Sequence, residues 1–173
     1  MPSQEVIILP NNSNVILSAE QVARLSSKRV FVVPTQYMPE AITAMFAYNE
    51  NDTVEDVFHA MCHEIQHVRV GEITRAVRDA NMNNHNIRSG QLMGLCDGEI
   101  VTAGDSLHDI MQSLIDELYN ENAEIITLYY GCDVTEEEAN HVQQFVQQQY
   151  AECVDIQLYA GGQPLYDFII TVE

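Results

Sequence analysis

The 173-residue sequence is poor in positive charge and lacks long apolar runs. Only 7 Lys and Arg side chains stand against 26 Asp and Glu, so the formal net charge is −19. Such a surface repels the phosphates of nucleic acids and the head groups of anionic lipids, which excludes binding to either. No apolar run approaches the roughly 18 residues that span a bilayer, so we expect no membrane insertion.

The sequence also lacks an export signal and a CxxC motif. The first five residues carry no base, and the apolar run after them is too short for a signal peptide. The four cysteines are widely spaced: Cys62, Cys96, Cys132 and Cys153. We therefore expect reduced, mostly buried thiols in a cytoplasmic protein.

The few cations all fall in the first half of the chain: Arg24, Lys28, Arg29, Arg69, Arg75, Arg78 and Arg88. After Arg88 there are 16 acidic residues and no base. This asymmetry favours two lobes with different neighbours, although an acidic surface that only promotes solubility explains it as well. Apolar residues make up 46% of the chain, which is typical of a folded protein.

The first part of the chain predicts a parallel βαβ unit. Residues 5–9 and 29–33 are apolar, β-branched runs, and apolar residues recur at helical spacing between them, over 15–25. Two further helices are expected, one starting near Pro39 and one capped by Thr53 that runs to about Gln66. A strand–helix–strand connection of this kind favours parallel pairing.

From Val68 onward the apolar period changes to two. Residues 68–80 predict one extended strand, and 81–86 a loop rich in turn residues. Asp97-Gly98 between two apolar segments predicts a hairpin with a type I′ turn. Ser106 and Thr135 are expected to cap two helices, and residues 124–130, 154–159 and 168–172 to form strands.

These elements predict an α/β (α+β) protein made of two small α/β lobes. The first lobe covers residues 1–67 and holds the βαβ unit. The second covers residues 68–173 and holds a mixed sheet with a β-hairpin.

Two short motifs lie where ligands bind in α/β proteins. Asn11, Asn12 and Asn14 follow the first strand, where amide side chains and a helix N-terminus suit an anion or a partner's backbone. Simple turn and cap chemistry explains them equally well. Gly161 and Gly162 before Gln163 predict a tight turn rather than a phosphate cradle, because the sequence has no GxGxxG or Walker lysine.

The sequence His63-Glu-Ile-Gln-His67 matches the HExxH pattern of zinc peptidases. The helix ends near His67, and the available third ligands, His85 and Glu72, lie outside the usual context of such a site. We therefore favour titratable histidines on a helix edge and keep zinc at His63 and His67 as the alternative.

The arginines at 69, 75 and 78 need carboxylate partners, either Glu72 and Asp79 or another protein.

Six segments together resemble the C-terminal part of the dihydroxyacetone-kinase-like proteins, which include the ATP-binding component of bacterial fatty acid kinase. The matching segments are residues 6–12 with Asn14, 19–20, 32–35, 71–74 with 76–79, 97–98 and 161–166. They span nearly the whole chain in the expected order. The HExxH pattern and Asp167, where a proline is common, depart from the family.

The resemblance implies a DegV-like fold and a role in docking. In the family, an N-terminal domain binds Mg-ATP, and the C-terminal region docks a separate, fatty-acid-binding B-type subunit. We accordingly expect no cofactor and no catalytic residue in this chain, a first lobe that is truncated at its start, and Mg-ATP on a domain that precedes it. The residues expected to bind a partner or ligand are Asn11, Asn12, Asn14, Arg78, Gly162 and Gln163.

Three alternatives stay open beside docking. The chain could act alone as a phosphatase-like enzyme, although no nucleophile or metal set in the sequence favours this. It could bind fatty acids as a DegV-like domain. It could also form a homodimer.

Overall fold

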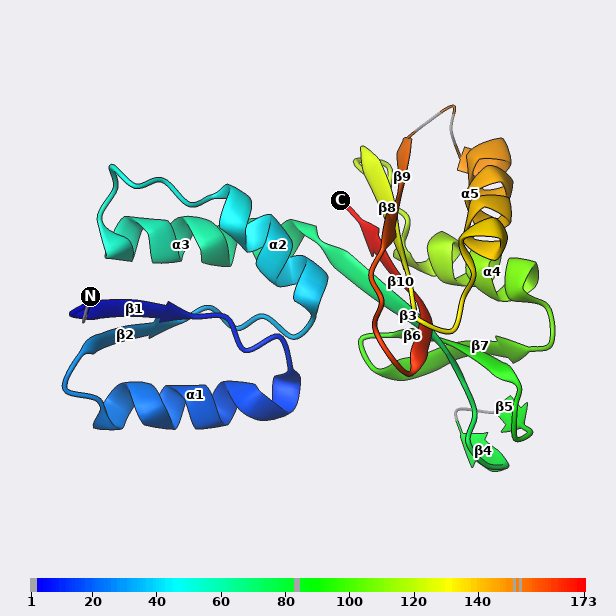
Figure 1. Ribbon diagram of the computed structural model, residues 1–173, viewed down its shortest axis with the longest axis horizontal. Coiled ribbons are helices and arrows are strands. Elements are labelled where there is room, and N and C mark those ends of the chain that lie inside the picture. Colours follow the sequence, from blue (N-terminus) through cyan, green and yellow to red (C-terminus); the bar gives the residue numbers. More distant parts are fainter. Residues whose placement is uncertain (1–2, 83–84, 151, 153) are drawn as a thin grey trace. The chain divides into compact units, whose positions relative to one another are not determined.

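A computed structural model describes residues 3–82, 85–150, 152 and 154–173 (Figure 1). The chain divides into two compact units, unit 1 up to Val68 and unit 2 from Arg69 to Glu173. Both are α/β, so the expected fold class is confirmed. No helix of the described residues is both long and apolar enough to cross a bilayer.

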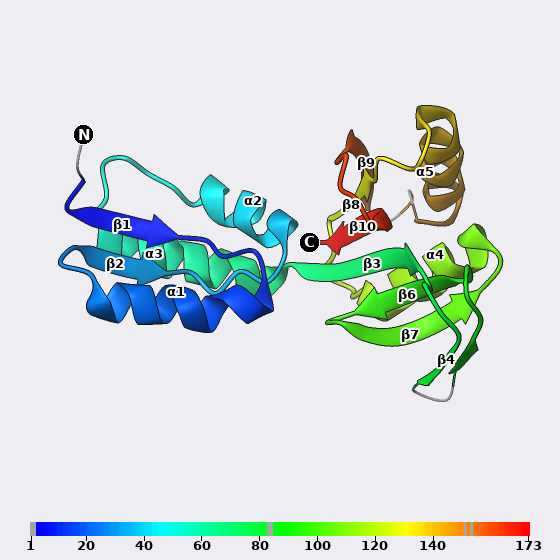
Figure 2. The same ribbon diagram turned by 60° about the horizontal axis from the view of Figure 1, so that its bottom comes forward.

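Unit 1 contains the predicted βαβ unit. Strands β1 (Glu5–Ile8) and β2 (Arg29–Val32) pair in parallel, with Glu5 opposite Arg29 and Ile8 opposite Val32. Helix α1 (Ser13–Leu25) and helix α3 (Val54–Glu64) lie on the two faces of this sheet, as Figure 2 shows. The core joins Val33, Ala44, Val57 and Met61.

Local capping chemistry sets the helix boundaries of unit 1. The Asn12 side chain accepts a hydrogen bond from the backbone of Asn14 at the start of α1, and Thr53 does the same for Asp56 at the start of α3. Helix α2 (Met38–Phe46) has Pro39 in its first turn, where a missing N–H costs nothing. A 3₁₀ turn, Ile65–His67, follows α3.

Unit 2 is built on a six-stranded mixed sheet with strand order β7-β6-β3-β10-β8-β9. Its strands are β3 (Arg69–Arg75), β6 (Leu92–Cys96), β7 (Glu99–Gly104), β8 (Ile125–Tyr130), β9 (Asp155–Ala160) and β10 (Tyr166–Val172). Strands β8 and β9 pair in parallel, and the other neighbours in this order pair antiparallel. The last strand therefore lies in the middle of the sheet, between β3 and β8.

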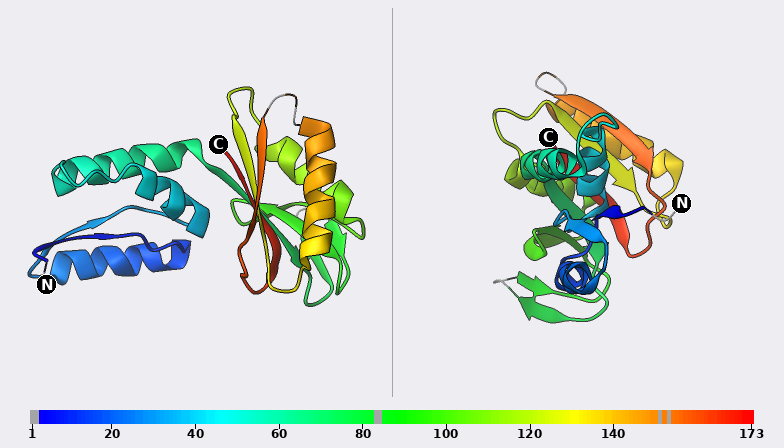
Figure 3. Two further views of the ribbon diagram at one scale, coloured as in Figure 1. Left: turned by 45° about the horizontal axis from the view of Figure 1, so that its top comes forward. Right: turned by 90° about the vertical axis from the view of Figure 1, so that its left-hand side faces the viewer.

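Two helices, α4 (Leu107–Leu118) and α5 (Glu136–Tyr150), cover one face of this sheet (Figure 3). Ser106 caps α4 through the backbone of Asp109, and the predicted inward residues of α4 are all buried: Ile110, Met111, Leu114, Ile115 and Leu118. They pack against Ile73, Leu128 and Phe168 of the sheet. The opposite face of the sheet carries no helix from the described residues of unit 2.

The predicted hairpin of unit 2 is present. Strands β6 and β7 pair through Cys96 and Glu99, and the two residues between them have φ angles of 52° at Asp97 and 78° at Gly98. A type I′ turn requires both angles to be positive.

The expected continuous strand from 68 to 80 is wrong. Strand β3 ends at Arg75, and the chain bends at residues 76–79 before β4 (Ala80–Met82) begins. Strand β4 pairs with β5 (His85–Ile87), so the segment predicted as a loop has strands on both sides of residues 83–84, which lie outside the described residues. The bend was mistaken for strand because residues 76–79 contain no glycine or proline and include the β-branched Val77.

The prediction of mostly buried thiols is also wrong for the cysteines that the structure describes. Cys96 is buried, Cys62 is half-buried and Cys132 is exposed. Cys132 lies in the polar turn before α5, where the chain leaves the core. Cys153 lies outside the described residues.

Candidate functional site

The asparagine motif lies where β1 and β2 end. Asn11 has a φ angle of 56°, and its backbone N–H donates to the hydroxyl of buried Thr35, which follows β2, at 3.1 Å. Asn12 caps α1 with its side-chain oxygen, 2.9 Å from the backbone nitrogen of Asn14. The structure thus places Asn11 and Asn12 at the carboxyl end of the two parallel strands, where ligands bind in open α/β sheets.

One polar atom of this motif is left unsatisfied. The Asn11 Oδ1 atom is buried and has no hydrogen-bond partner among the described residues, while its Nδ2 atom lies 3.5 Å from the Met38 sulfur. A buried acceptor without a donor is rare in folded proteins. A bound chain can reach this oxygen only when the Asn11 side chain turns outward, whereas Asn12 is already engaged as a cap. The binding role of these residues stays a prediction.

The Gly162-Gln163 motif forms a tight turn in unit 2, between β9 and β10. Gly162 has a φ angle of 65°, and the N–H groups of Gly161 and Gly162 both donate to the carbonyl of Tyr130. Gln163 Nε2 donates to the carbonyl of Tyr129 at 2.9 Å. These bonds attach the turn to the end of β8, so the amide of Gln163 serves the turn itself.

Arg78 lies in the bend after β3 and not on a strand, which corrects its expected position. The side chain is exposed and makes no ion pair with any described residue. It borders a shallow pocket of ≈ 170 Å³ with apolar walls from Ala76, Val77, Ala80, Ile87, Met93 and Ile100. An apolar pocket beside an unpaired guanidinium can hold an apolar group that carries a negative charge next to it.

Two polar pairs that the sequence reasoning missed join β3 to the start of β10. Glu72 on β3 is buried and accepts a hydrogen bond from the Tyr166 hydroxyl. Arg75 Nη2 lies 2.9 Å from Oδ2 of Asp167, which is also buried. The expected internal partners of the arginines, Glu72 and Asp79, are therefore wrong, because Asp167 of β10 pairs with Arg75.

Arg69, at the other end of β3, bonds to the backbone of a helix end. Its Nη1 atom donates to the carbonyls of Glu117 at 2.7 Å and Leu118 at 3.1 Å, in the last turn of α4. A cation at this position satisfies the free carbonyls of the helix end and interacts favourably with the helix dipole. Arg69 is thus a structural residue, and no signal in the sequence identifies its partner 48 residues away.

Burial raises the pKa of the Glu72 carboxyl above its ordinary value of 4.5, and the hydrogen bond from Tyr166 opposes this rise. The folded chain then holds the proton more tightly than the unfolded chain, so the stability that Glu72 contributes is greatest below pH 4.5 and is lost as the pH rises through the raised pKa. We expect Glu72→Gln to gain stability relative to the parent chain as the pH rises from about 4 to about 8.

Urea unfolding at a series of pH values measures this difference. The control is Glu99→Gln, which makes the same change at an exposed strand residue. A constant difference between Glu72→Gln and the parent chain across the pH range would show that Glu72 titrates normally.

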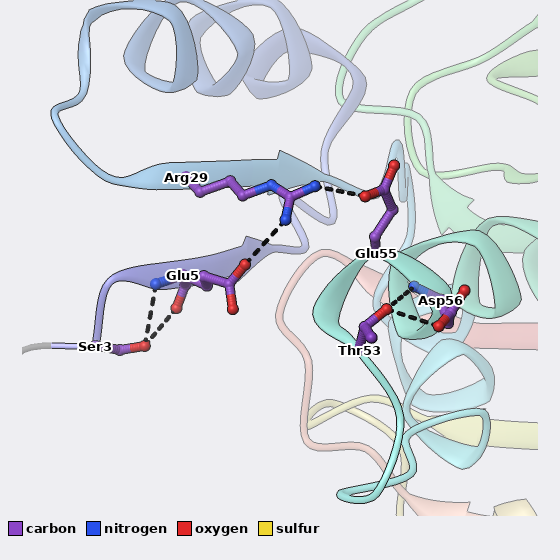
Figure 4. Close-up of polar contacts among 6 residues, drawn as sticks. All are labelled: Ser3, Glu5, Arg29, Thr53, Glu55 and Asp56. Carbon is purple, nitrogen blue, oxygen red and sulfur yellow. Dashed lines mark hydrogen bonds and ion pairs between the residues drawn. The ribbon is translucent and has the colours of Figure 1, made fainter.

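At the amino ends of the strands, Arg29 joins three elements of unit 1 (Figure 4). Its guanidinium bonds to Glu5 of β1 at 3.2 Å and to Glu55 in the first turn of α3, and lies 5.0 Å from the centre of the Phe31 ring. Glu55 also suits the positive end of the α3 dipole. This network is exposed and links β1, β2 and α3 at the end opposite the asparagine motif, so we regard it as structural.

The family model for the FakA-like C-terminal region, from a component of fatty acid kinase, matches residues 1–173. This chain belongs to that family. Protein YloV of Bacillus subtilis is 34% identical over 168 residues, which cover 97% of this chain and 30% of that protein. An uncharacterized protein of Staphylococcus aureus (strain USA300) is 31% identical over 98% of this chain and 31% of its own length. The chain thus spans about a third of the length of the curated relatives that it matches.

Solved structures of DegV proteins show the same fold as this FakA-like region. The DegV family protein Cg2579 of Corynebacterium glutamicum has a TM-score of 0.65 at 10% identity, over 98% of this chain and 75% of its own. The fatty acid kinase B3 protein of Streptococcus pneumoniae, loaded with linoleic acid, has a TM-score of 0.59 at 12% identity, over 97% and 70%. At such low identities the likeness shows the fold alone.

The HExxH pattern of this FakA-like chain does not assemble a metal site within the described residues. The His63 and His67 rings are 4.9 Å apart, and His63 Nδ1 lies 3.4 Å from Oε1 of Glu64. No three His, Cys, Asp or Glu side chains of the described part come together as metal ligands. The zinc alternative gains no third ligand from Glu72, which is buried beside Tyr166, and the His85 side chain lies outside the described residues.

Proposed function

We propose that this chain is the docking domain of a fatty acid kinase-like protein and binds a fatty-acid-binding subunit. The observation that carries the proposal is the family match over residues 1–173. Mg-ATP is then held by a domain outside this chain, since the sequence has no phosphate-binding loop. The chain's part in the reaction is to hold the protein that carries the acyl group, which raises the effective concentration of the acyl carboxylate near the nucleotide.

The asparagine motif of unit 1 supports docking because it offers an unsatisfied acceptor and a helix N-terminus at the carboxyl end of the strands. If the Asn11 side chain turns outward on binding, an N–H group of a partner satisfies Oδ1, which has no donor among the described residues. Arg78, exposed and unpaired within the described chain, offers a cation to a partner carboxylate.

Isothermal titration calorimetry of the purified chain with a fatty-acid-loaded B-type subunit tests the proposal. We expect saturable binding, and a loss of about tenfold in affinity for Asn12→Asp if the capped turn lies in the interface. Aspartate keeps the helix cap, so the fold of α1 is preserved. Asn122→Asp, in an exposed loop of unit 2, adds the same charge as a control. Absence of any heat of binding with the parent chain would refute docking.

A second candidate function is direct binding of a fatty acid. DegV family proteins of this fold have been solved with heptadecanoic acid and with other fatty acids. If this chain has the same role, fatty acid should copurify with it and be found by mass spectrometry of an organic extract. A clean extract after expression in lipid-rich medium would eliminate this candidate.

A further inference from the structure

Leu165 is presented to solvent in a conformation that leucine disfavours. Its φ angle is 74°, in the left-handed region where a Cβ atom is strained, and 78% of the residue is exposed. Glycine would fill this position without strain. A bulky apolar residue held in such a state, with no core to reach, indicates a role outside the fold.

The backbone around Leu165 is fixed on both sides. The Thr74 hydroxyl of β3 donates to the Leu165 carbonyl, and the N–H groups of Gly131 and Cys132 donate to the carbonyls of Asp167 and Gln163. The turn therefore holds the leucine in place. Little backbone entropy is lost when a partner binds such a turn, which favours binding.

The neighbouring strand ends in a second fixed turn with an exposed apolar residue. Val77, in the bend after β3, is 91% exposed, the highest value for a large apolar residue in the described part of the chain. Gly90 N–H donates to the carbonyl of Ala76, and Ser89 donates to the carbonyl of Val77 and to the Asp79 carboxylate. Because Tyr166 pairs with Thr74, both turns lie at the same end of the sheet.

This end of the sheet also gathers the cations of unit 2. Unit 2 has 18 acidic residues and four arginines, of which Arg75, Arg78 and Arg88 lie here. Four acids face these arginines. Asp167 forms an ion pair with Arg75, and Glu138 lies within electrostatic reach of Arg75. Asp79 and Asp105 accept hydrogen bonds from Ser89 and Gln91. Arg78 and Arg88 have no ion-pair partner within the described chain, so their charge is available to another molecule.

We infer that the two turns, residues 76–79 and 161–166, form the surface of unit 2 on which the partner protein docks. Leu165 and Val77 enter apolar hollows of the partner, and a partner carboxylate pairs with Arg78 above the apolar pocket of ≈ 170 Å³. The occupant is a folded protein whose contact surface is apolar and carries a carboxylate opposite Arg78, because that guanidinium has no ion-pair partner within the described chain. This inference rests on the proposed docking function and names its surface.

Leu165→Gly separates binding from stability. The substitution removes the anchor and relieves the positive φ angle, so we expect a urea midpoint equal to or above that of the parent chain and an affinity for the B-type subunit at least about tenfold lower. Leu165→Ala should lose the same affinity without the gain in stability. Leu25→Ala, at an exposed leucine in the last turn of α1, away from the asparagine motif, is the control and should bind like the parent chain.

Arg78→Glu gives an independent test through charge. We expect a loss of more than about tenfold and recovery when the partner's acidic contact residue is changed to lysine. If the parent chain binds the B-type subunit and Leu165→Gly and Arg78→Glu bind it with the same affinity, the proposed surface is wrong and the docking function stands. A parent chain that does not bind at all would overturn both.

Discussion

Phe168→Ala is expected to lower the free energy of unfolding of unit 2 by about 3–5 kcal/mol. Phe168 lies on β10 in the middle of the sheet, opposite Ile73 of β3 and Tyr130 of β8, and its side chain is fully buried. It packs in the core cluster formed with α4 and α5. Removing the ring leaves a cavity that the neighbouring strands cannot close, because both are held by backbone hydrogen bonds.

Urea unfolding followed by near-ultraviolet circular dichroism measures this loss. Six of the eight tyrosines lie in unit 2 and the chain has no tryptophan, so the signal reports mainly on that unit. Phe46→Ala makes the same change at an 84% exposed residue of α2 and should shift the free energy by less than about 0.5 kcal/mol. Equal effects of the two substitutions would show that β10 is not central to the core.

The elements that the sequence predicted well are those with local causes. Thr53 and Ser106 cap their helices through residues three positions on, and the hairpin turn at Asp97-Gly98 follows from the backbone angles that those two residues tolerate. The parallel pair β1–β2 was predictable because a short strand–helix–strand segment allows few other arrangements.

The features that escaped prediction join residues far apart in the chain. Arg75 and its partner Asp167 are neighbours only because β10 inserts between β3 and β8, and no local pattern specifies that strand order. The bend at residues 76–79 was missed because it contains no glycine or proline that would mark a break in the strand. Its hydrogen bonds come from Ser89 and Gly90, which are brought close by the β4–β5 pairing.

The same difference between local and long-range causes explains which residues of the candidate site could be predicted. The position of the asparagines at the carboxyl end of the strands was predictable because it follows from the βαβ unit, whereas their binding role stays a prediction. Leu165 gave no signal, since nothing in Pro-Leu-Tyr predicts a positive φ angle at the leucine. Its conformation results from bonds to Thr74 and from the attachment of the turn to β8, both of which depend on the complete sheet.

Gly131→Ala is expected to cost unit 2 at least about 3 kcal/mol. Gly131 is buried at the end of β8, where a Cβ atom would lie 2.1 Å from the Tyr166 carbonyl oxygen and 2.9 Å from that of Gln163. Both are backbone atoms at the turn that carries Leu165, so relief requires the turn to move away from β8. Gly104→Ala, where the nearest atom would be an Ile110 side-chain carbon at 3.7 Å, is the matched control and should change stability by less than about 0.5 kcal/mol.

The same substitution separates the packing of the turn from its docking role. Moving the turn would break the hydrogen bonds from Gly131 to Asp167 and from Cys132 to Gln163, and with them the position of Leu165. Gly131→Ala should therefore lose both stability and affinity for the B-type subunit, whereas Leu165→Gly should lose affinity alone. If Gly131→Ala proves as stable as Gly104→Ala, the close approach of the turn to β8 does not exist in solution, and the fixed presentation of Leu165 that docking requires is lost with it.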